Sequence, residues 1–183
     1  MKKINFDFPI YSISNFVNKL ENKKNIIDSV LINRKYHNKN LGYNYPILDD
    51  YNYFFENLYK SYYDFCLSHF NFTVNQSRNR STCWAYVSDK YNFYEVWHNH
   101  LNTSTINGVY YLSIPNNNTS IDFSLNEKKF SHHPKENELI IFPNYLDHAP
   151  NRCNGDGYRI AINMEIICNE TSDELFSRLK EYA

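Results

Sequence analysis

The stretch from about residue 80 to residue 167 restricts the fold most, because it is a series of short segments rich in β-forming residues. Clusters of turn-forming residues separate these segments. The connections are too short to contain the crossover helix that joins parallel strands, so we expect antiparallel strands. The expected strands are residues 82–87, 93–98, 108–114, 121–123, 139–142 and 158–167.

The first half of the chain is expected to be helical. Apolar residues recur at steps of three and four over residues 50–69, which predicts an amphipathic helix packed on a sheet. A weaker pattern predicts a helix over 16–31, with Ser14 or Asn15 as its N-cap. A polar helix is expected over 172–181.

Helices followed by short strands predict an α+β fold, in which N-terminal helices buttress a β-sandwich. A chain of 183 residues suits one domain with one sizeable core. We therefore expect a single domain over residues 1–183, with helical support over about 14–70 and a β core over about 80–167.

Composition excludes several classes of function. The net charge of -1 gives no electrostatic reason to expect binding to nucleic acid or to an anionic membrane. No Gly-rich phosphate-binding motif and no Cys-x-x-Cys pair occurs. No apolar run could span a bilayer, and the N-terminus lacks the apolar segment of a signal peptide. We expect a cytoplasmic protein with no nucleic-acid or membrane partner.

Three histidines are candidates for a metal site. His98 and His100 stand two residues apart at the end of an expected strand, so their side chains share a face. His148 follows 48 residues after His100, just beyond another expected strand. Three ligands on one face leave the opposite face of an ion open for substrates. The alternative is that His98 and His100 are two exposed histidines at a strand end.

Arg159 begins a strand that alternates cleanly. Ile160 and the apolar residues at two-residue steps after it lie on one face, which must pack on a core. Arg159, Asn163 and Glu165 lie on the other face. If that face lines the interior of a barrel, Arg159 needs an anion, and a carboxylate is its natural bidentate partner. If the face is exposed to solvent, Arg159 is a surface charge.

Several aromatic residues are candidates for a pocket. Of Tyr110 and Tyr111, one must face inward, where its hydroxyl is able to share an anion with Arg159. Trp84 and Tyr86 are candidates for the wall of a substrate pocket, together with Asn163 on the strand of Arg159. Ordinary core packing explains the aromatic residues equally well.

In combination, four segments resemble the small stand-alone 2-oxoglutarate/Fe(II)-dependent oxygenases of bacteria and tailed phages, which are related to prolyl hydroxylases. The resemblance covers roughly residues 82–167. The segments that carry it are WHNH (97–100), INGVYYL (106–112), LIIFPNYLDH (139–148) and YRIAIN (158–163).

The resemblance implies a double-stranded β-helix, which is a cupin-like jelly roll, with Fe(II), 2-oxoglutarate and O2 as cofactor and cosubstrates. By position, His98 and His148 resemble the two constant metal ligands. Arg159 resembles the residue that pairs with the distal carboxylate of 2-oxoglutarate, and Tyr111 resembles a tyrosine that adds its hydroxyl to that carboxylate.

His100 stands where the wider superfamily has Asp or Glu. Either His100 binds the metal, or water or a second anion fills that position. A neutral imidazole in place of a carboxylate leaves the metal site one unit more positive. Asp147 is expected to point away from its neighbour His148 on an extended strand, and Glu95 to point away from His98.

The expected activity is hydroxylation of an unactivated C–H bond in an amino acid, a peptide or protein side chain, or a small metabolite, with release of succinate and CO2. One alternative is a three-histidine dioxygenase of the thiol-oxidising type, which does not use 2-oxoglutarate. Another is a β-barrel that binds metal without catalysis. Exposed edge strands also allow a homodimer.

Overall fold

The computed structural model describes residues 1–36, 43–46, 53–78, 82–93, 96–115 and 119–179. The described elements are, in order, β1 (Lys2–Lys3), β2 (Tyr11–Ser14), α1 (Lys23–Asn33), β3 (Lys35–Tyr36), β4 (Tyr43–Pro46), α2 (Tyr53–Phe70), β5 (Thr82–Ser88), β6 (Ile106–Ser113), β7 (Ile121–Leu125), β8 (Lys128–His132), β9 (Glu138–Pro143), β10 (Asp147–Pro150), β11 (Arg159–Ile166) and α3 (Ser172–Arg178).

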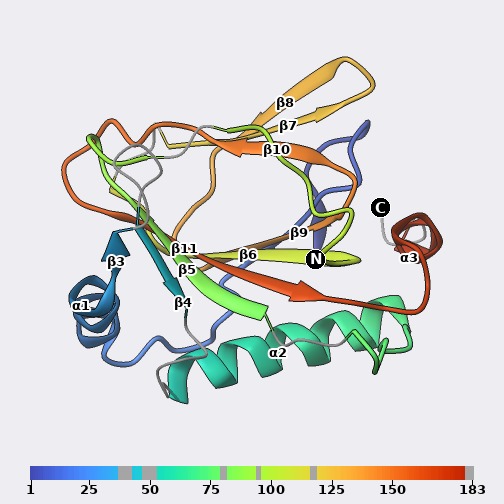
Figure 1. Ribbon diagram of the computed structural model, residues 1–183, viewed down its shortest axis with the longest axis horizontal. Coiled ribbons are helices and arrows are strands. Elements are labelled where there is room, and N and C mark those ends of the chain that lie inside the picture. The colour runs from blue at the N-terminus through green and yellow to red at the C-terminus, as the bar shows by residue number, and fades with distance from the viewer. Residues whose placement is uncertain (37–42, 47–52, 79–81, 94–95, 116–118, 180–183) are drawn as a thin grey trace.

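Two β-sheets face each other across the middle of the molecule (Figure 1). The larger sheet has the strand order β1-β2-β9-β6-β11-β5-β4-β3, and the smaller sheet has the order β10-β7-β8. All strand pairs among the described residues are antiparallel, as the short connections predicted. This arrangement confirms the expected α+β fold with a double-stranded β-helix, or jelly roll.

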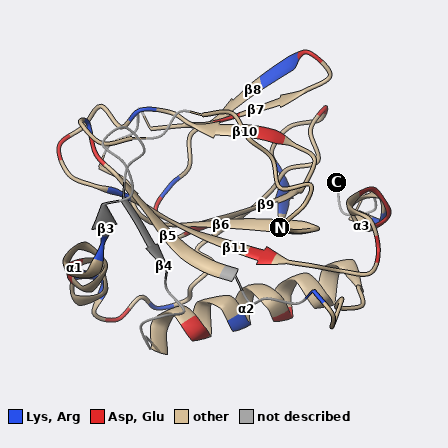
Figure 2. Cartoon of the chain, in the orientation of Figure 1, with Lys and Arg blue, Asp and Glu red and all other residues tan. Residues whose placement is uncertain are grey.

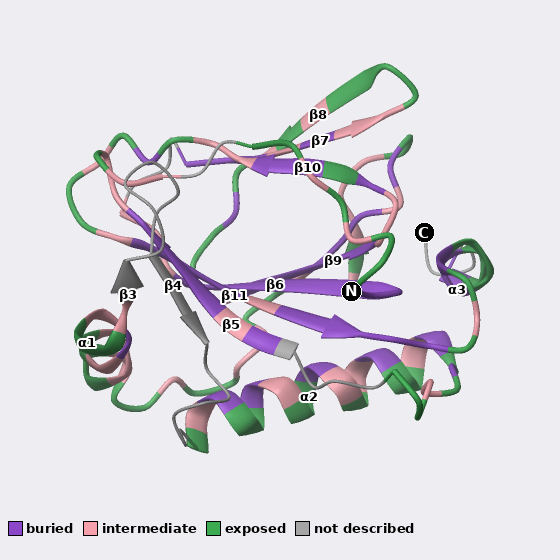
Figure 3. Ribbon diagram, viewed as in Figure 1, coloured by how far each residue is buried: buried purple, intermediate pink, exposed green. Residues whose placement is uncertain are grey.

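Helix α2 covers the outer face of the larger sheet (Figures 1 and 3). It forms because its apolar residues recur at helical spacing, and Phe55, Leu58 and Tyr62 are buried against the sheet. A Cβ on Gly108 of β6 would lie 2.5 Å from Cε2 of Tyr62, so only glycine allows the helix to approach here. The helix predicted over 50–69 is thus confirmed as α2.

A second apolar cluster fills the space between the two sheets. Val109 and Tyr111 of β6, Ile140 and Phe142 of β9, and Phe123 of β7 belong to it. These residues alternate along their strands with residues that face α2, because successive side chains of a strand point to opposite faces. The inner faces of β5 and β11 border the same space, and they carry the polar residues of the candidate site.

The N-terminal helix prediction was wrong in its position. Helix α1 begins only at Lys23, after Asn22 in the left-handed conformation, and neither Ser14 nor Asn15 caps it. Residues 11–14 form β2 instead, paired with β9. β2 precedes the predicted helix, and its pairing with residues so distant in sequence leaves no local pattern from which it could be predicted.

Further strand assignments differ from expectation. The short strands β1, β3 and β4 of the larger sheet, and β8 and β10 of the smaller sheet, were not expected. The described residues of the expected strand 93–98 form only an isolated bridge, between His98 and His148.

α3 lies within the predicted C-terminal helix, and the side chains of Thr171 and Glu174 form a capping box at its start. None of the described helices is both long and apolar enough to cross a bilayer.

Candidate metal centre

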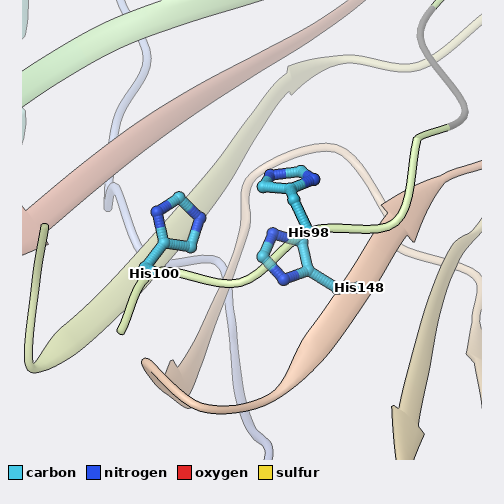
Figure 4. Close-up of side chains that lie close together, drawn as sticks. All are labelled: His98, His100 and His148. Atoms are coloured by element: carbon cyan, nitrogen blue, oxygen red, sulfur yellow. The ribbon is translucent and has the colours of Figure 1, made fainter. Parts of the chain in front are cut away.

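His98, His100 and His148 converge between the sheets (Figure 4). One potential ligand atom from each imidazole lies within 4.8 Å of the others. Two backbone hydrogen bonds hold His98 beside His148: His98 N donates to His148 O at 3.0 Å, and His148 N donates to His98 O at 2.9 Å. His100 N donates to the carbonyl of Asn144 at 2.8 Å. The backbone therefore brings the three imidazoles together across a long interval of sequence.

Each imidazole has a partner at Nδ1. Nδ1 of His98 lies 3.0 Å from the carbonyl oxygen of Val96, and Nδ1 of His148 lies 3.1 Å from that of Leu146. Nδ1 of His100 lies 2.7 Å from the Glu165 carboxylate. Carbonyl and carboxylate oxygens accept hydrogen bonds, so each Nδ1 carries a proton, and in a neutral imidazole of this tautomer Nε2 keeps its lone pair. This tautomer leaves three Nε2 atoms as ligands for one ion.

The surroundings keep two of these imidazoles neutral. Burial, together with the neighbouring His98 and His100, lowers the pKa of His148 to about 3. Burial also lowers the pKa of His98, although the carbonyl of Val96 opposes the shift. A neutral imidazole is the form that binds a metal ion, so the cluster suits a divalent cation at neutral pH.

Arg159 lies on the inner face of β11 and is 1% exposed. Its Nε donates to Ser88 Oγ at 3.1 Å, and Nη1 donates to the carbonyl of Ser120 at 3.2 Å. Nη2 is buried without a hydrogen-bond partner, and no carboxylate of the described residues forms an ion pair with Arg159. A buried guanidinium without a counter-ion is unfavourable, so this position suits an anion. Arg159 is therefore not the solvent-exposed charge that the alternative predicted.

Tyr111, which was expected near Arg159, lies on the same inner face of the larger sheet. Tyr111 is buried on the inner face of β6, opposite Ala161 in the strand pairing. Burial raises the pKa of Tyr111 above its usual value, and the Arg159 guanidinium opposes the shift, which places that charge near the phenol. Tyr110 faces the other way and donates to Asn137 at 3.1 Å.

The three candidates for the substrate pocket also border the interior. Trp84 pairs with Asn163 in the register of β5 and β11, and both side chains are half-buried. The guanidinium carbon of Arg159 lies 5.8 Å from the centroid of the Tyr86 ring. These positions fit a pocket wall, and the assignment of the residues to a substrate stays a prediction.

Two buried carboxylates were not assigned a role from the sequence. Glu165 contacts His100, and the only signal for it was its position on the strand face of Arg159. Glu138 of β9 accepts hydrogen bonds from Ser12 and from the backbone N of Lys135, and its carboxylate lies 2.9 Å from His132 Nε2. Burial alone would raise the pKa of Glu138, but these partners lower it below its usual value. Glu138 thus ties β8 to the larger sheet.

Asp147, next to His148 in sequence, is not brought into the cluster by any described contact. Asp147 is exposed and accepts a hydrogen bond from Asn99 at 2.8 Å, in agreement with the outward direction expected for it. Glu95 lies outside the described residues.

No known protein family matches the sequence, and no curated protein matches it. Solved structures do match. A prolyl-4-hydroxylase from Pseudomonas putida has 10% identity and a TM-score of 0.67, over 89% of this chain and 94% of that chain. A prolyl hydroxylase from Trichoplax adhaerens, in complex with a peptide fragment of the hypoxia inducible factor oxygen degradation domain, has 15% identity and a TM-score of 0.69, over 87% and 83%.

A third match is HygX from Streptomyces hygroscopicus, solved with nickel, 2-oxoglutarate and hygromycin B bound. It has 13% identity and a TM-score of 0.62, over 90% of this chain and 85% of that chain. At such low identity the similarity shows the fold: the chain has the double-stranded β-helix that these oxygenases share.

Proposed function

We propose that the protein is an Fe(II)- and 2-oxoglutarate-dependent dioxygenase. In this proposal His98, His100 and His148 hold the iron through Nε2, and Arg159 binds the distal carboxylate of 2-oxoglutarate with help from Tyr111. The observation that carries the proposal is a buried guanidinium without an anion, on a strand whose same face also reaches the three-histidine cluster.

The residues present fit Fe(II) with bound 2-oxoglutarate. Three imidazole nitrogen donors on one side of an ion leave the other positions open, and Nη2 of Arg159 is a buried donor without an acceptor. Bound iron would supply O2 activation coupled to the decarboxylation of 2-oxoglutarate to succinate and CO2. The protein would orient the cosubstrate and exclude water, for which the apolar cluster between the sheets is suited.

The proposed substrate carries an unactivated C–H bond in an amino acid, a peptide or protein side chain, or a small metabolite. Val96, Trp97 and Leu101 flank the metal-binding histidines in sequence and have exposed apolar side chains, which suit contact with such a substrate. Among the matched structures, one holds a peptide fragment and one holds hygromycin B, so the fold accepts both kinds of partner in those proteins.

Other parts of the sequence-based expectation remain proposals. They are a single domain over residues 1–183, a cytoplasmic location, a homodimer formed through edge strands, and the absence of a nucleic-acid partner. Acidic and basic residues are interspersed along the described chain (Figure 2), which supports the last of these.

A three-histidine dioxygenase that oxidises thiols is the competing function. The cluster of three imidazoles without a coordinating carboxylate favours it. It does not require the buried guanidinium of Arg159, and this residue is the reason that we prefer the 2-oxoglutarate enzyme.

The test is anaerobic addition of Fe(II) and then 2-oxoglutarate to the apoprotein, followed by the visible spectrum. We expect a charge-transfer band that needs both additions. Arg159→Met should raise the Kd for 2-oxoglutarate about 100-fold, because it removes a buried charge-assisted contact. Arg152→Met, which removes an exposed guanidinium from a loop, is the matched control and should leave the Kd unchanged.

Three outcomes separate the candidate functions. Iron binding without a new band, together with oxygen uptake on a thiol, would favour the three-histidine dioxygenase. Iron binding with no turnover of either kind would leave a barrel that only binds metal. An unchanged Kd in Arg159→Met would refute the role of Arg159.

A further inference from the structure

We propose that Glu165 is a positioning residue for the metal, and that through His100 it supplies the negative charge that an Asp or Glu ligand would otherwise supply. The inference rests on the proposed function only in that it requires a metal at the three histidines. It concerns a residue that does not itself bind the ion.

The geometry joins Glu165 to His100 directly. Oε1 of Glu165 lies 2.7 Å from Nδ1 of His100 and accepts a hydrogen bond from Thr103 Oγ1 at 3.2 Å. A carboxylate only accepts hydrogen bonds, so the proton of its contact with His100 lies on Nδ1. Thr103 Oγ1 also lies near this nitrogen, at 3.3 Å. The pair therefore points Nε2 of His100 away from Glu165 and toward the other imidazoles, with which it forms the cluster.

Both partners are largely shielded from water. The side chain of Glu165 is 6% exposed and that of His100 is 15% exposed. At the surface, solvent would screen such a pair and its effect would be small. In this buried position the carboxylate fixes the orientation of the imidazole and makes its free nitrogen a stronger donor.

Charge explains why a carboxylate is placed here. Two neutral imidazoles and one carboxylate give a divalent ion a site of net charge +1, whereas three neutral imidazoles leave it at +2. Adding Glu165 at a distance of one hydrogen bond returns the site to +1. The carboxylate is thus displaced from the ion to the far side of His100, and the more positive site expected from the sequence is largely compensated.

The backbone of β11 also holds Glu165 in place. Its carbonyl accepts a hydrogen bond from the Tyr59 hydroxyl of α2 at 3.0 Å, and the residue pairs with Thr82 and Asn107 on the neighbouring strands. The sheet therefore fixes the backbone of Glu165, and Thr103 and His100 hold its carboxylate.

The test compares the affinity of wild type and Glu165→Gln for Co(II), which is measured by competition with a chromophoric chelator. Glutamine keeps an acceptor for His100 Nδ1 but removes the charge. We expect Co(II) affinity to fall about 10- to 100-fold in Glu165→Gln. The matched control is Glu136→Gln, which removes an exposed carboxylate paired with Lys23 and should leave the affinity unchanged.

A measurement on the unmutated protein covers the case in which Glu165→Gln fails to fold. In Zn(II)-loaded wild type, the Nδ1 proton of His100 should appear strongly downfield in the imidazole NMR spectrum, because it is shared with a carboxylate. A His100 Nδ1 proton without this shift would overturn the inference.

The outcomes separate this inference from the proposed function. Equal Co(II) affinity in wild type and Glu165→Gln would overturn the inference alone. Tight Co(II) binding that depends on Glu165, with no binding of 2-oxoglutarate, would support the inference and overturn the proposed oxygenase. Absence of Co(II) binding by the wild type would overturn both.

Discussion

The two faces of β11 show how one strand serves two different purposes. On the outer face, Ile160, Ile162 and Met164 are fully buried against the core beneath α2. On the inner face, Arg159 and Glu165 are 1% and 5% exposed. Burial of apolar side chains stabilises the fold, whereas burial of charges opposes it unless they are paired. The outer face therefore stabilises the fold, and the inner face carries the charged residues to which we assign the proposed binding roles.

The largest expected effect lies on the outer face. Ile162→Ala should lower the free energy of unfolding by about 2–5 kcal/mol, because it leaves a cavity in a fully buried cluster. Urea denaturation measures this loss. The affinity of the folded variant for Co(II) should not change, and a fall in affinity comparable to that of a ligand variant would show that the two faces are not independent.

Acid should act on His148 of β10, in the cluster that the inner face of β11 borders. The pKa of His148 is lowered to about 3 in the folded state, so the unfolded chain binds more protons below its usual pKa of 6.5. This contribution to stability is complete above pH 6.5 and declines as the pH falls toward 3. The apoprotein should lose about 3 kcal/mol between pH 7 and pH 4 from this residue.

Denaturation at several pH values checks this sign. His148→Gln should have a shallower dependence of stability on pH than the wild type over the same interval. If the two proteins have parallel pH profiles, His148 is not held neutral by burial.

The smallest effect on stability is expected at Arg159, the residue that we propose binds 2-oxoglutarate. Arg159→Met should change the free energy of unfolding of the apoprotein by less than about 1 kcal/mol, or increase it, because it replaces an unpaired buried cation by an apolar side chain of similar length. Thermal denaturation measures it, with Arg152→Met as the control. A loss above about 2 kcal/mol would mean that the hydrogen bonds to Ser88 and Ser120 outweigh the burial of the charge.

The sequence predicted the parts of the fold whose residues follow a strict period. β11 alternates apolar and polar residues, and α2 has one apolar stripe, so both were found. β8 is mostly polar, and β2 is a short strand that pairs with β9, more than one hundred residues away. Their pairing depends on tertiary contacts that leave no periodic signal.

The site was predicted to a similar extent. The His-x-His pair, His148 and Arg159 could be named because their residue types and order are themselves informative. The contact of Glu165 with His100 could not, since it depends on how the segment after β5 crosses the inner face of β11. The alternation of β11 gave the correct face for Glu165 but not its partner.

The paired backbone hydrogen bonds between His98 and His148 bear on which ion the protein selects. They fix the separation of the two backbones at the proposed metal site, so ions of different preferred geometry would meet the same pair. Discrimination among first-row metals would then depend on His100, whose Nδ1 lies 2.7 Å from Glu165 and 3.3 Å from Thr103 Oγ1. We therefore expect the proposed site to accept several divalent ions, so that its loading with iron would depend on the metals available where the protein folds.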